Sequence, residues 1–156
     1  MPVLHIRPAT LADIDHIVRI ANAAFIIERS FIDRDRTSPD EVRAMFETGA
    51  FLAGDDETGA MAACVYVEQR GDRGYFGLLS VDPAHHRRGF GRAMIDAVEA
   101  YLRVRGCRAL DIRVVNLRTE LPPIYAKLGF VETGTEPLVD PDLFLPAHFI
   151  RMSKRL

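Results

Sequence analysis

Residues 82–92 bring together an abrupt turn, positive charge and glycine. Asp82 and Pro83 break an apolar run of strand length at residues 75–81, and a helical apolar pattern begins at about Phe90. A helix N-terminus presents unpaired N–H groups and the positive end of the helix dipole. Glycine lets a backbone approach closely, and arginine can bind an anion through two hydrogen bonds. These residues therefore predict a phosphate or pyrophosphate site, and its candidate members are His85, His86, Arg87, Arg88, Gly89, Gly91 and Arg92.

The familiar nucleotide motifs do not fit this loop. A Walker loop requires a spaced glycine followed by Gly-Lys-Ser or Gly-Lys-Thr, and the chain contains no such run here. A dinucleotide fingerprint requires glycine or alanine where Met94 stands. An unrelated phosphate-binding module stays open as an interpretation of the loop taken alone.

Length and composition suit one domain, residues 1–156, in a chain of 156 residues with 48% apolar and 27% charged residues. The net charge of −2 argues against nucleic acid as a partner, so the positive loop is a local site. The chain start shows no signal-peptide pattern and no later run is long enough to span a bilayer, which predicts a cytoplasmic protein without membrane contact. Cys64 and Cys107 lack metal-ligand spacing, and we expect buried, reduced thiols and no metal site.

The first half of the chain predicts a strand at residues 3–7, a helix from Leu11 to about Glu28 capped by Thr10, and a second helix from Ser38 to Gly49. Three strands follow at residues 50–53, 61–69 and 74–81. The turns between them are rich in glycine and aspartate, which favours an antiparallel meander.

The second half predicts a helix from Phe90 that stops before Gly106 and a strand at residues 107–115 parallel to the strand before that helix. A short helix in LPPIYAKLGF and closing strands at residues 130–133 and 148–152 complete the order. The order predicts an α+β domain with a mixed sheet.

Two motifs resemble those of the GNAT superfamily of N-acetyltransferases. Residues 81–83, Val-Asp-Pro, and residues 88–93, Arg-Gly-Phe-Gly-Arg-Ala, are similar to its acetyl-CoA loop, and residues 124–130, IYAKLGF, are similar to its second signature, Leu-Tyr-x-Lys-Leu-Gly-Phe. The predicted element order also coincides with the GNAT fold over essentially the whole chain. The resemblance implies a mixed, largely antiparallel sheet of about seven strands flanked by four helices.

The resemblance also implies acetyl-CoA as cosubstrate, with no metal. Backbone N–H groups of Leu79 and Val81 would pair with the pantetheine arm and stabilise the oxyanion. The family's first Arg or Gln is replaced by His86, which offers fewer donors, and His85 or Arg87 could take over that contact. Asn116 is a weaker match, since it lies nine residues before Tyr125 where the family commonly has Asn seven before. The implied cofactor-binding residues are Leu79, Val81, His86, Arg87, Arg88, Gly89, Phe90, Gly91, Arg92 and Asn116.

Acetyl transfer from a thioester to an amine needs an acid for the departing thiolate and an acceptor for the amine proton. By resemblance Tyr125 is the general acid. Residues 75–81 contain no acid, so the base stays open among Glu28, Glu68 and Glu120, and none is assigned. Residues 26–36 border the acceptor site in the family. They carry three acids and three arginines here, which favours no acceptor charge.

The function that the resemblance implies is transfer of acetyl from acetyl-CoA to a primary amine by direct attack in a ternary complex. The acceptor is a small molecule or a peptide, and the family's habit of pairing through sheet edges makes a homodimer an expectation. The alternative is a GNAT-like module that binds CoA as a sensor or partner without turnover.

Overall fold

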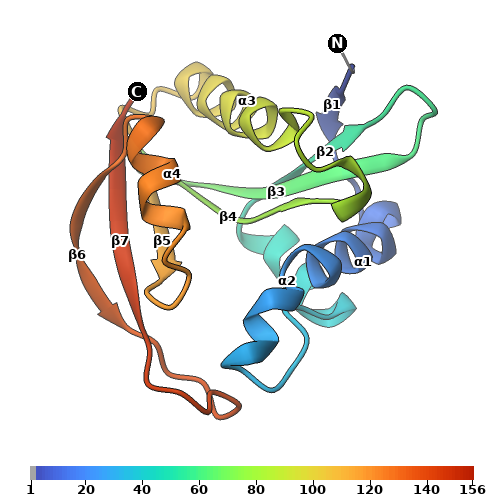
Figure 1. The fold of residues 1–156 in the computed structure, drawn as a ribbon. Helices are drawn as coiled ribbons and strands as arrows, with labels where there is room; N and C mark the ends of the chain where they lie inside the picture. The colour runs from blue at the N-terminus through green and yellow to red at the C-terminus, as the bar shows by residue number, and fades with distance from the viewer. Residues whose placement is uncertain (1–2) are drawn as a thin grey trace.

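The computed structural model describes residues 3–156 and contains one seven-stranded sheet in the order β1-β2-β3-β4-β5-β7-β6 (Figure 1). Its elements are β1 (His5–Pro8), α1 (Ile14–Ala24), α2 (Pro39–Thr48), β2 (Ala50–Asp55), β3 (Met61–Arg70), β4 (Arg73–Val81), α3 (Phe90–Val104), β5 (Ala109–Val115), α4 (Leu121–Lys127), β6 (Val131–Pro137) and β7 (His148–Arg155). Among the strand pairs of residues 3–156, only β4–β5 is parallel. The expected α+β architecture with a mixed, largely antiparallel sheet and four helices is confirmed.

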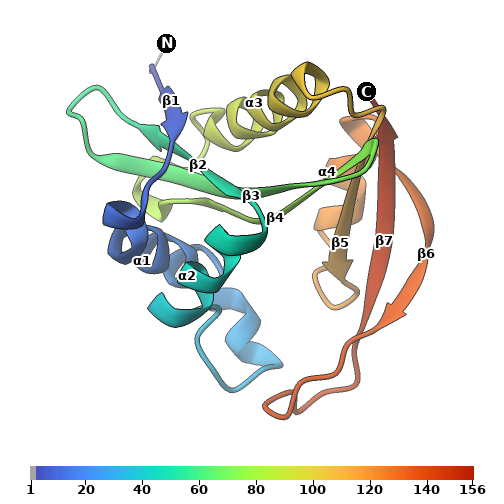
Figure 2. The same cartoon turned by 180° about the vertical axis from the view of Figure 1, so that it is seen from behind.

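Helices cover both faces of the sheet. Helices α1 and α2 lie on one face, and α3 and α4 on the other (Figures 1 and 2). Ile17, Ile20 and Phe51 belong to the core on the first face, while Met94 and Leu102 belong to the core on the second. Strand β3 is buried through most of its length because both layers pack on it.

The first helix differs from its expected bounds. The chain forms a short 3₁₀ turn at Leu11–Asp13 before α1, which ends at Ala24, and a second 3₁₀ turn follows at Ile26–Ser30. Thr10 does cap the first turn, and Asp13 accepts a hydrogen bond from the Thr10 N–H over 2.8 Å. The single helix expected from Leu11 to about Glu28 is therefore wrong at both ends, because the chain changes to tighter bonding there.

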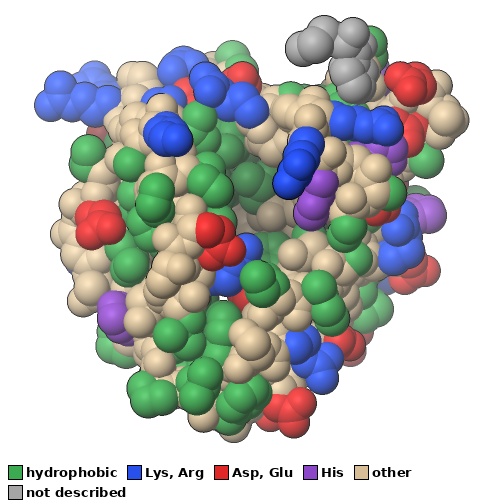
Figure 3. Space-filling model, in the orientation of Figure 1, with side chains coloured by type: hydrophobic (Ala, Val, Ile, Leu, Met, Phe, Trp, Pro, Cys, Tyr) green, Lys and Arg blue, Asp and Glu red, His purple; other side chains and the backbone are tan. Residues whose placement is uncertain are grey.

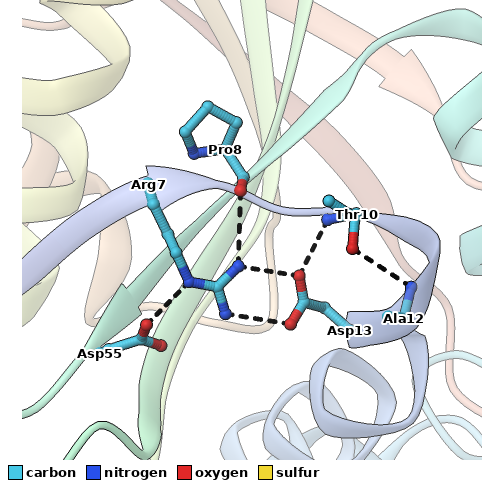
Figure 4. Close-up of polar contacts among 6 residues, drawn as sticks. All are labelled: Arg7, Pro8, Thr10, Ala12, Asp13 and Asp55. Carbon is cyan, nitrogen blue, oxygen red and sulfur yellow. Dashed lines mark hydrogen bonds and ion pairs between the residues drawn. The ribbon is translucent and has the colours of Figure 1, made fainter.

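Arg7 holds this corner together (Figure 4). Its guanidinium donates two hydrogen bonds to Asp13, at 2.9 and 3.0 Å, and one to Asp55 at 2.7 Å. One side chain thus links β1, the turn before α1 and the end of β2.

Strand β4 contains a bulge at Leu78, whose φ is +54°. The register with β3 shifts between Cys64 and Tyr66, so two β4 residues, Leu78 and Leu79, face one position of β3. The extra residue turns Leu78 toward the α1 core, whereas Phe76 and Leu79 pack on the α3 side. The bulge therefore changes which β4 side chains face each layer.

Pairing between β4 and β5 ends early. Its last pair is Tyr75 with Asp111, although β4 continues to Val81 and β5 to Val115. Beyond that pair the two strands diverge, and the sheet splits into a half formed by β1–β4 and a half formed by β5–β7 (Figure 1). The split leaves backbone groups of β4 without a partner strand on that side.

Two connections meet at the end of the split, where β4 and β5 have diverged. A bridge pairs Ile32 with Leu143, the Asp33 N–H donates to the Asp142 carbonyl over 2.8 Å, and the Phe144 N–H donates to the Phe31 carbonyl over 3.0 Å. Both ribbon views show the α1–α2 connection and the β6–β7 connection side by side (Figures 1 and 2). The two halves of the sheet are therefore joined by backbone hydrogen bonds at this end.

Candidate functional site

A cavity of about 500 Å³ occupies the split between β4 and β5. The space-filling view shows the surface hollowed between the two halves of the sheet (Figure 3). The cavity walls come from β4 and β5, from the chain around Phe25–Arg36, from α4 and from the start of the β6–β7 connection. The residues on which its chemistry depends are Phe25, Glu28, Arg34, Arg36, Leu79, Arg118, Tyr125 and Asp140.

Tyr125 lies on α4 with its side chain against the cavity. Its ring packs edge-on against Phe130 and at a tilt against Phe76, at centroid distances of 5.6 and 6.1 Å. Its hydroxyl makes no hydrogen bond within residues 3–156, yet it is not sealed from solvent. Burial raises the pKa of Tyr125 to about 12, with a smaller opposing effect from Arg118. The hydroxyl is therefore a protonated donor at neutral pH that faces open space.

Leu79 and Val81 lie after the bulge, on the part of β4 that has no partner in β5. Leu79 lines the cavity, and Val81 lies beside the start of α3, where a β-carbon at Gly91 would come within 3.8 Å of it. The bulged edge of β4 thus runs from the cavity to the N-terminus of α3. This arrangement fits an extended ligand that pairs with backbone groups along β4.

The N-terminus of α3 is open to an anion. Gly89 is the N-cap in the left-handed region, at φ +77°, and no side chain of residues 3–156 caps the helix. Within the described chain the first helical bond is from the Ala93 N–H to the Gly89 carbonyl, at 3.0 Å, so the N–H groups of Phe90, Gly91 and Arg92 are left over. A β-carbon at Gly91 would meet only ordinary contact with Val81. Glycine there leaves space at the helix start, and the cradle fits a pyrophosphate.

In the loop at residues 85–92 some side chains are held by contacts within the protein, and others are exposed to solvent. Phe90 is buried and packs against the His85 ring at a centroid distance of 5.6 Å, so only its backbone faces the loop. His85 Nε2 lies 3.4 Å from Asp56, and its Nδ1 lies 3.3 Å from Arg88. Arg92 pairs with Asp96. His86 and Arg87 are exposed, and Arg87 adopts a left-handed φ of +65°.

Asn116 lies just after β5 and is occupied by the fold. Its side-chain oxygen accepts from the His148 N–H over 2.8 Å, and its own N–H donates to the His148 carbonyl over 2.9 Å. The residue therefore fixes the beginning of β7. Its expected role in cofactor binding stays a prediction.

The three acids left open as bases have different surroundings. Glu68 accepts hydrogen bonds from Tyr66 and Arg70, and Glu120 is a surface partner of Arg118. Glu28 alone of these three lines the cavity, and its Oε2 accepts from Arg118 Nη1 over 2.9 Å. The 3₁₀ turn after α1 places this carboxylate inside.

The sequence analysis did not single out Phe25 or Arg118, and it counted Arg36 only among the mixed charges of residues 26–36. The Arg36 guanidinium lies 5.0 Å from the Phe25 ring centroid, and that of Arg118 lies 5.9 Å from it. None of the three belongs to a motif, and their approach depends on the fold. Phe25 in particular occupied an ordinary apolar helix position in the sequence.

Within residues 3–156 no cluster of His, Cys, Asp or Glu could hold a metal ion. The two cysteines are buried free thiols, as expected. No helix in the same part of the chain is long and apolar enough to cross a membrane.

Residues 15–130 match the model of the acetyltransferase (GNAT) family, and the chain belongs to that family.

Two curated relatives are acetyltransferases. The mycothiol acetyltransferase of Propionibacterium freudenreichii subsp. shermanii is 26% identical over 130 residues, which are 80% of this chain and 42% of the relative. The chain thus spans less than half of that protein. Glucosamine 6-phosphate N-acetyltransferase 1 of Oryza sativa subsp. japonica is 30% identical over 144 residues, 84% of this chain and 83% of the relative.

Solved structures share the fold. Ard1 from Thermoplasma volcanium matches with a TM-score of 0.81 and 18% identity, covering 98% of this chain and 97% of that one. The yncA protein from Salmonella typhimurium, solved with its cofactor acetyl-CoA, matches with a TM-score of 0.76 and 21% identity, covering 98% and 94%. At these identities the likeness concerns the fold alone.

Proposed function

We propose that this acetyltransferase uses acetyl-CoA to acetylate a primary amine by direct attack in a ternary complex. The observation that carries the proposal is the free Tyr125 hydroxyl in a cavity that Leu79 of β4 also lines, while Val81 of the same strand lies beside the open N-terminus of α3. That cradle has unpaired N–H groups and nearby arginines for a pyrophosphate. The unpaired edge of β4 has backbone groups for a pantetheine arm.

Acetyl-CoA supplies an acetyl group on a thioester. The backbone N–H groups of Leu79 and Val81 stabilise the carbonyl oxygen as negative charge develops on it. The Tyr125 hydroxyl, which is protonated at neutral pH, donates its proton to the departing sulfur. The transfer forms the amide C–N bond, breaks the thioester C–S bond and leaves free CoA.

The attacking amine must lose a proton. Glu28 is the acid that we assign to this step, through water where the amine is not in direct reach. Its Oε1 makes no hydrogen bond with the described residues and is not sealed from solvent, while Arg118 holds Oε2. A carboxylate anchored at one oxygen and open at the other is suited to orient an ammonium group and to pass on its proton.

The test has two parts. Acetyl-CoA, ATP and NAD are compared for their effect on the thermal midpoint of unfolding. A ligand at roughly one hundred times its dissociation constant adds about 2.7 kcal/mol, which shifts a domain of this size by several degrees. A shift with acetyl-CoA alone supports the cofactor site, and a similar shift with ATP contradicts it.

The second part follows release of free thiol from acetyl-CoA with a panel of primary amines. Amine-dependent release supports the transfer reaction. Binding of acetyl-CoA without release for any amine would favour the non-catalytic CoA-binding module.

A further inference from the structure

Four arginines and two acids line the cavity, so the two acids cannot pair with every arginine. Arg34 donates to Asp140 from Nε and Nη2, at 3.0 and 2.6 Å. Arg118 pairs with Glu28 over 2.9 Å. Arg113 lies over the Phe149 ring at 4.3 Å and reaches Glu136 outside the cavity at 3.5 Å. Both cavity acids are therefore already paired.

Arg36 is left over. Within residues 3–156 its guanidinium makes no hydrogen bond and no ion pair, and its one close charge contact is with the face of the Phe25 ring. The unpartnered nitrogens of the Arg36 side chain are in contact with solvent, and the residue lines the cavity. The cavity wall therefore carries a guanidinium whose donors are unused and reachable by solvent.

The surroundings make this cation costly to leave alone. Burial is the main effect on the pKa of Arg36 and lowers it, while Glu28 opposes that shift. A guanidinium still stays protonated at neutral pH, so the charge persists. A partly buried charge without a partner is stabilised by an incoming anion, and the planar fork of arginine matches a carboxylate through two hydrogen bonds.

Two joined connections at the end of the split limit which amine acceptors can enter the cavity. Phe31, Ile32, Arg34 and residues 138–140 line the cavity. The connections that carry them are joined by the Ile32–Leu143 bridge and the Arg34–Asp140 pair. Backbone hydrogen bonds between these connections close the end of the split. A polypeptide cannot pass between them without breaking that bridge, which favours a small acceptor.

We propose that Arg36 binds a carboxylate on the amine acceptor, so that the substrate is a small amino acid-like molecule with its amine at Glu28 and its acid group at Arg36. This inference rests on the proposed function. It replaces the expectation of no preferred acceptor charge, which came from counting charges at residues 26–36. The pairing pattern shows that the charges at those positions do not cancel inside the cavity.

The test compares matched acceptors with the full chain and acetyl-CoA. Each common L-amino acid is assayed beside its α-amide and its decarboxylated amine, with the aminophosphonate analogue as a second oxyanion. We expect kcat/KM for the best acid to exceed that of its amide by about tenfold or more, because a hydrogen bond to a charged group contributes a binding free energy of that size. A faster aminophosphonate would identify a phosphonate or phosphate as the preferred anion and would overturn the carboxylate assignment.

Two variants assign any preference to Arg36. R36Q should raise KM for the acid and abolish its advantage over the amide, with little change in turnover of the amide. R29Q is the matched control, because Arg29 lies in the same segment, pairs with Asp33 and Asp35 outside the cavity and does not line it. Equal rates for acid and amide, or an acid preference that survives in R36Q, would overturn the proposal.

A binding measurement covers the case in which no amine is turned over. N-acetyl amino acids and their amides are compared for thermal protection of the CoA-loaded protein, in the wild type and in R36Q. Protection by the acids alone, lost in R36Q, supports the anion site even if the reaction differs. No selective protection in the wild type overturns it, and failure of acetyl-CoA itself to bind is a failure of the proposed function instead.

Discussion

Arg118 and Glu28 form a partly buried ion pair across the cavity, with Nη1 and Oε2 2.9 Å apart. Arg118 lies between β5 and α4, whereas Glu28 lies in the 3₁₀ turn after α1. The pair therefore joins the two halves of the split sheet and holds Glu28 at the place where we put the acceptor amine.

Removal of Arg118 should destabilise the protein. In R118M the Glu28 carboxylate loses its partner but stays largely buried, and we expect a loss of about 2 kcal/mol in the free energy of unfolding. The double variant R118M/E28Q removes the uncompensated charge and should recover part of the loss. Urea denaturation of the single and double variants measures the coupling, and simple additivity would contradict a direct pair.

Glu28→Gln is expected to act on the reaction more than on cofactor binding. The amide keeps the size of the side chain but cannot accept the amine proton at neutral pH, so kcat should fall by about tenfold to a hundredfold. The dissociation constant of acetyl-CoA should stay within about a factor of two by the same reasoning. E120Q is the matched control, since Glu120 also pairs with Arg118 but does not line the cavity. Equal turnover in E28Q and the wild type would remove Glu28 from the proton path.

Tyr125→Phe should lower turnover with the fold and acetyl-CoA affinity nearly kept. The ring contacts with Phe76 and Phe130 remain, and only the free hydroxyl is lost. General acid catalysis contributes about a hundredfold or more, so a fall of that order is expected in kcat. Tyr101→Phe is the control, because Tyr101 lies on α3 under Arg105. Unchanged kcat in Y125F would end the assignment of Tyr125 as the acid.

Much of the scaffold could be predicted from the sequence because its signals are local. The turns around Gly59 and Gly71 lie between strands that form the expected meander, and α3 begins at Phe90 as its apolar pattern indicated. The bulge at Leu78 carries no comparable signal, since leucine rarely adopts a positive φ and its position follows from packing on both faces of β4.

The charges of the site depend on long-range contacts and could not be predicted in the same way. The partner of Arg34 lies 106 residues away and that of Glu28 lies 90 residues away. Counting the charges within residues 26–36 therefore could not reveal that Arg36 stays unpaired. The expected homodimer and cytoplasmic location stay predictions.

Stability should fall at alkaline pH because several buried groups, Cys64 and Tyr125 among them, lose protons more readily in the unfolded chain. Burial raises the pKa of Cys64 from 9.0 to about 12 and that of Tyr125 from 10.0 to about 12. Both groups are protonated in both states below about pH 8, where the full stability is present, and the unfolded chain loses protons first as the pH rises. Each group should contribute a slope of up to about 1.4 kcal/mol per pH unit between its unfolded pKa and about 12.

Urea midpoints from pH 8 to pH 11 test this slope. Cys64→Ala and Tyr125→Phe should each make the decline less steep, after correction for their stability at pH 8. A decline that is identical in the variants and the wild type would show that other groups cause it.

Asp13 should stabilise the corner around Arg7, and its contribution to stability should be lost at acid pH. Hydrogen bonds from Arg7 lower the pKa of Asp13, with help from the Thr10 N–H against an opposing effect of burial. The contribution is therefore present above the unfolded pKa near 3.8 and is lost as the pH falls through the lower folded value. We expect D13A to lose about 1–2 kcal/mol at pH 7, because a capping contact and a charged pair disappear. D15A is the control on the next exposed position, and equal losses in the two variants would contradict a specific role for Asp13.

Gly89 and Gly91 should respond to alanine in opposite ways. Gly89 has a φ of +77°, where a β-carbon is strained, so G89A should lose about 1 kcal/mol of stability without ligand. Gly91 has an ordinary φ, and a β-carbon there would have only Val81 nearby, at 3.8 Å. Alanine also favours a helix more than glycine, so G91A should be as stable as the wild type or more stable.

A methyl group at position 91 would nevertheless occupy the space at the start of α3 that we assign to the pyrophosphate. Calorimetric titration with CoA should therefore show a dissociation constant raised by about tenfold in G91A, given the loss of one or more charged hydrogen bonds. Unchanged affinity in G91A, together with unchanged affinity in R88A, would exclude this loop from the cofactor site, because the fold itself gives no other reason for either variant to bind normally.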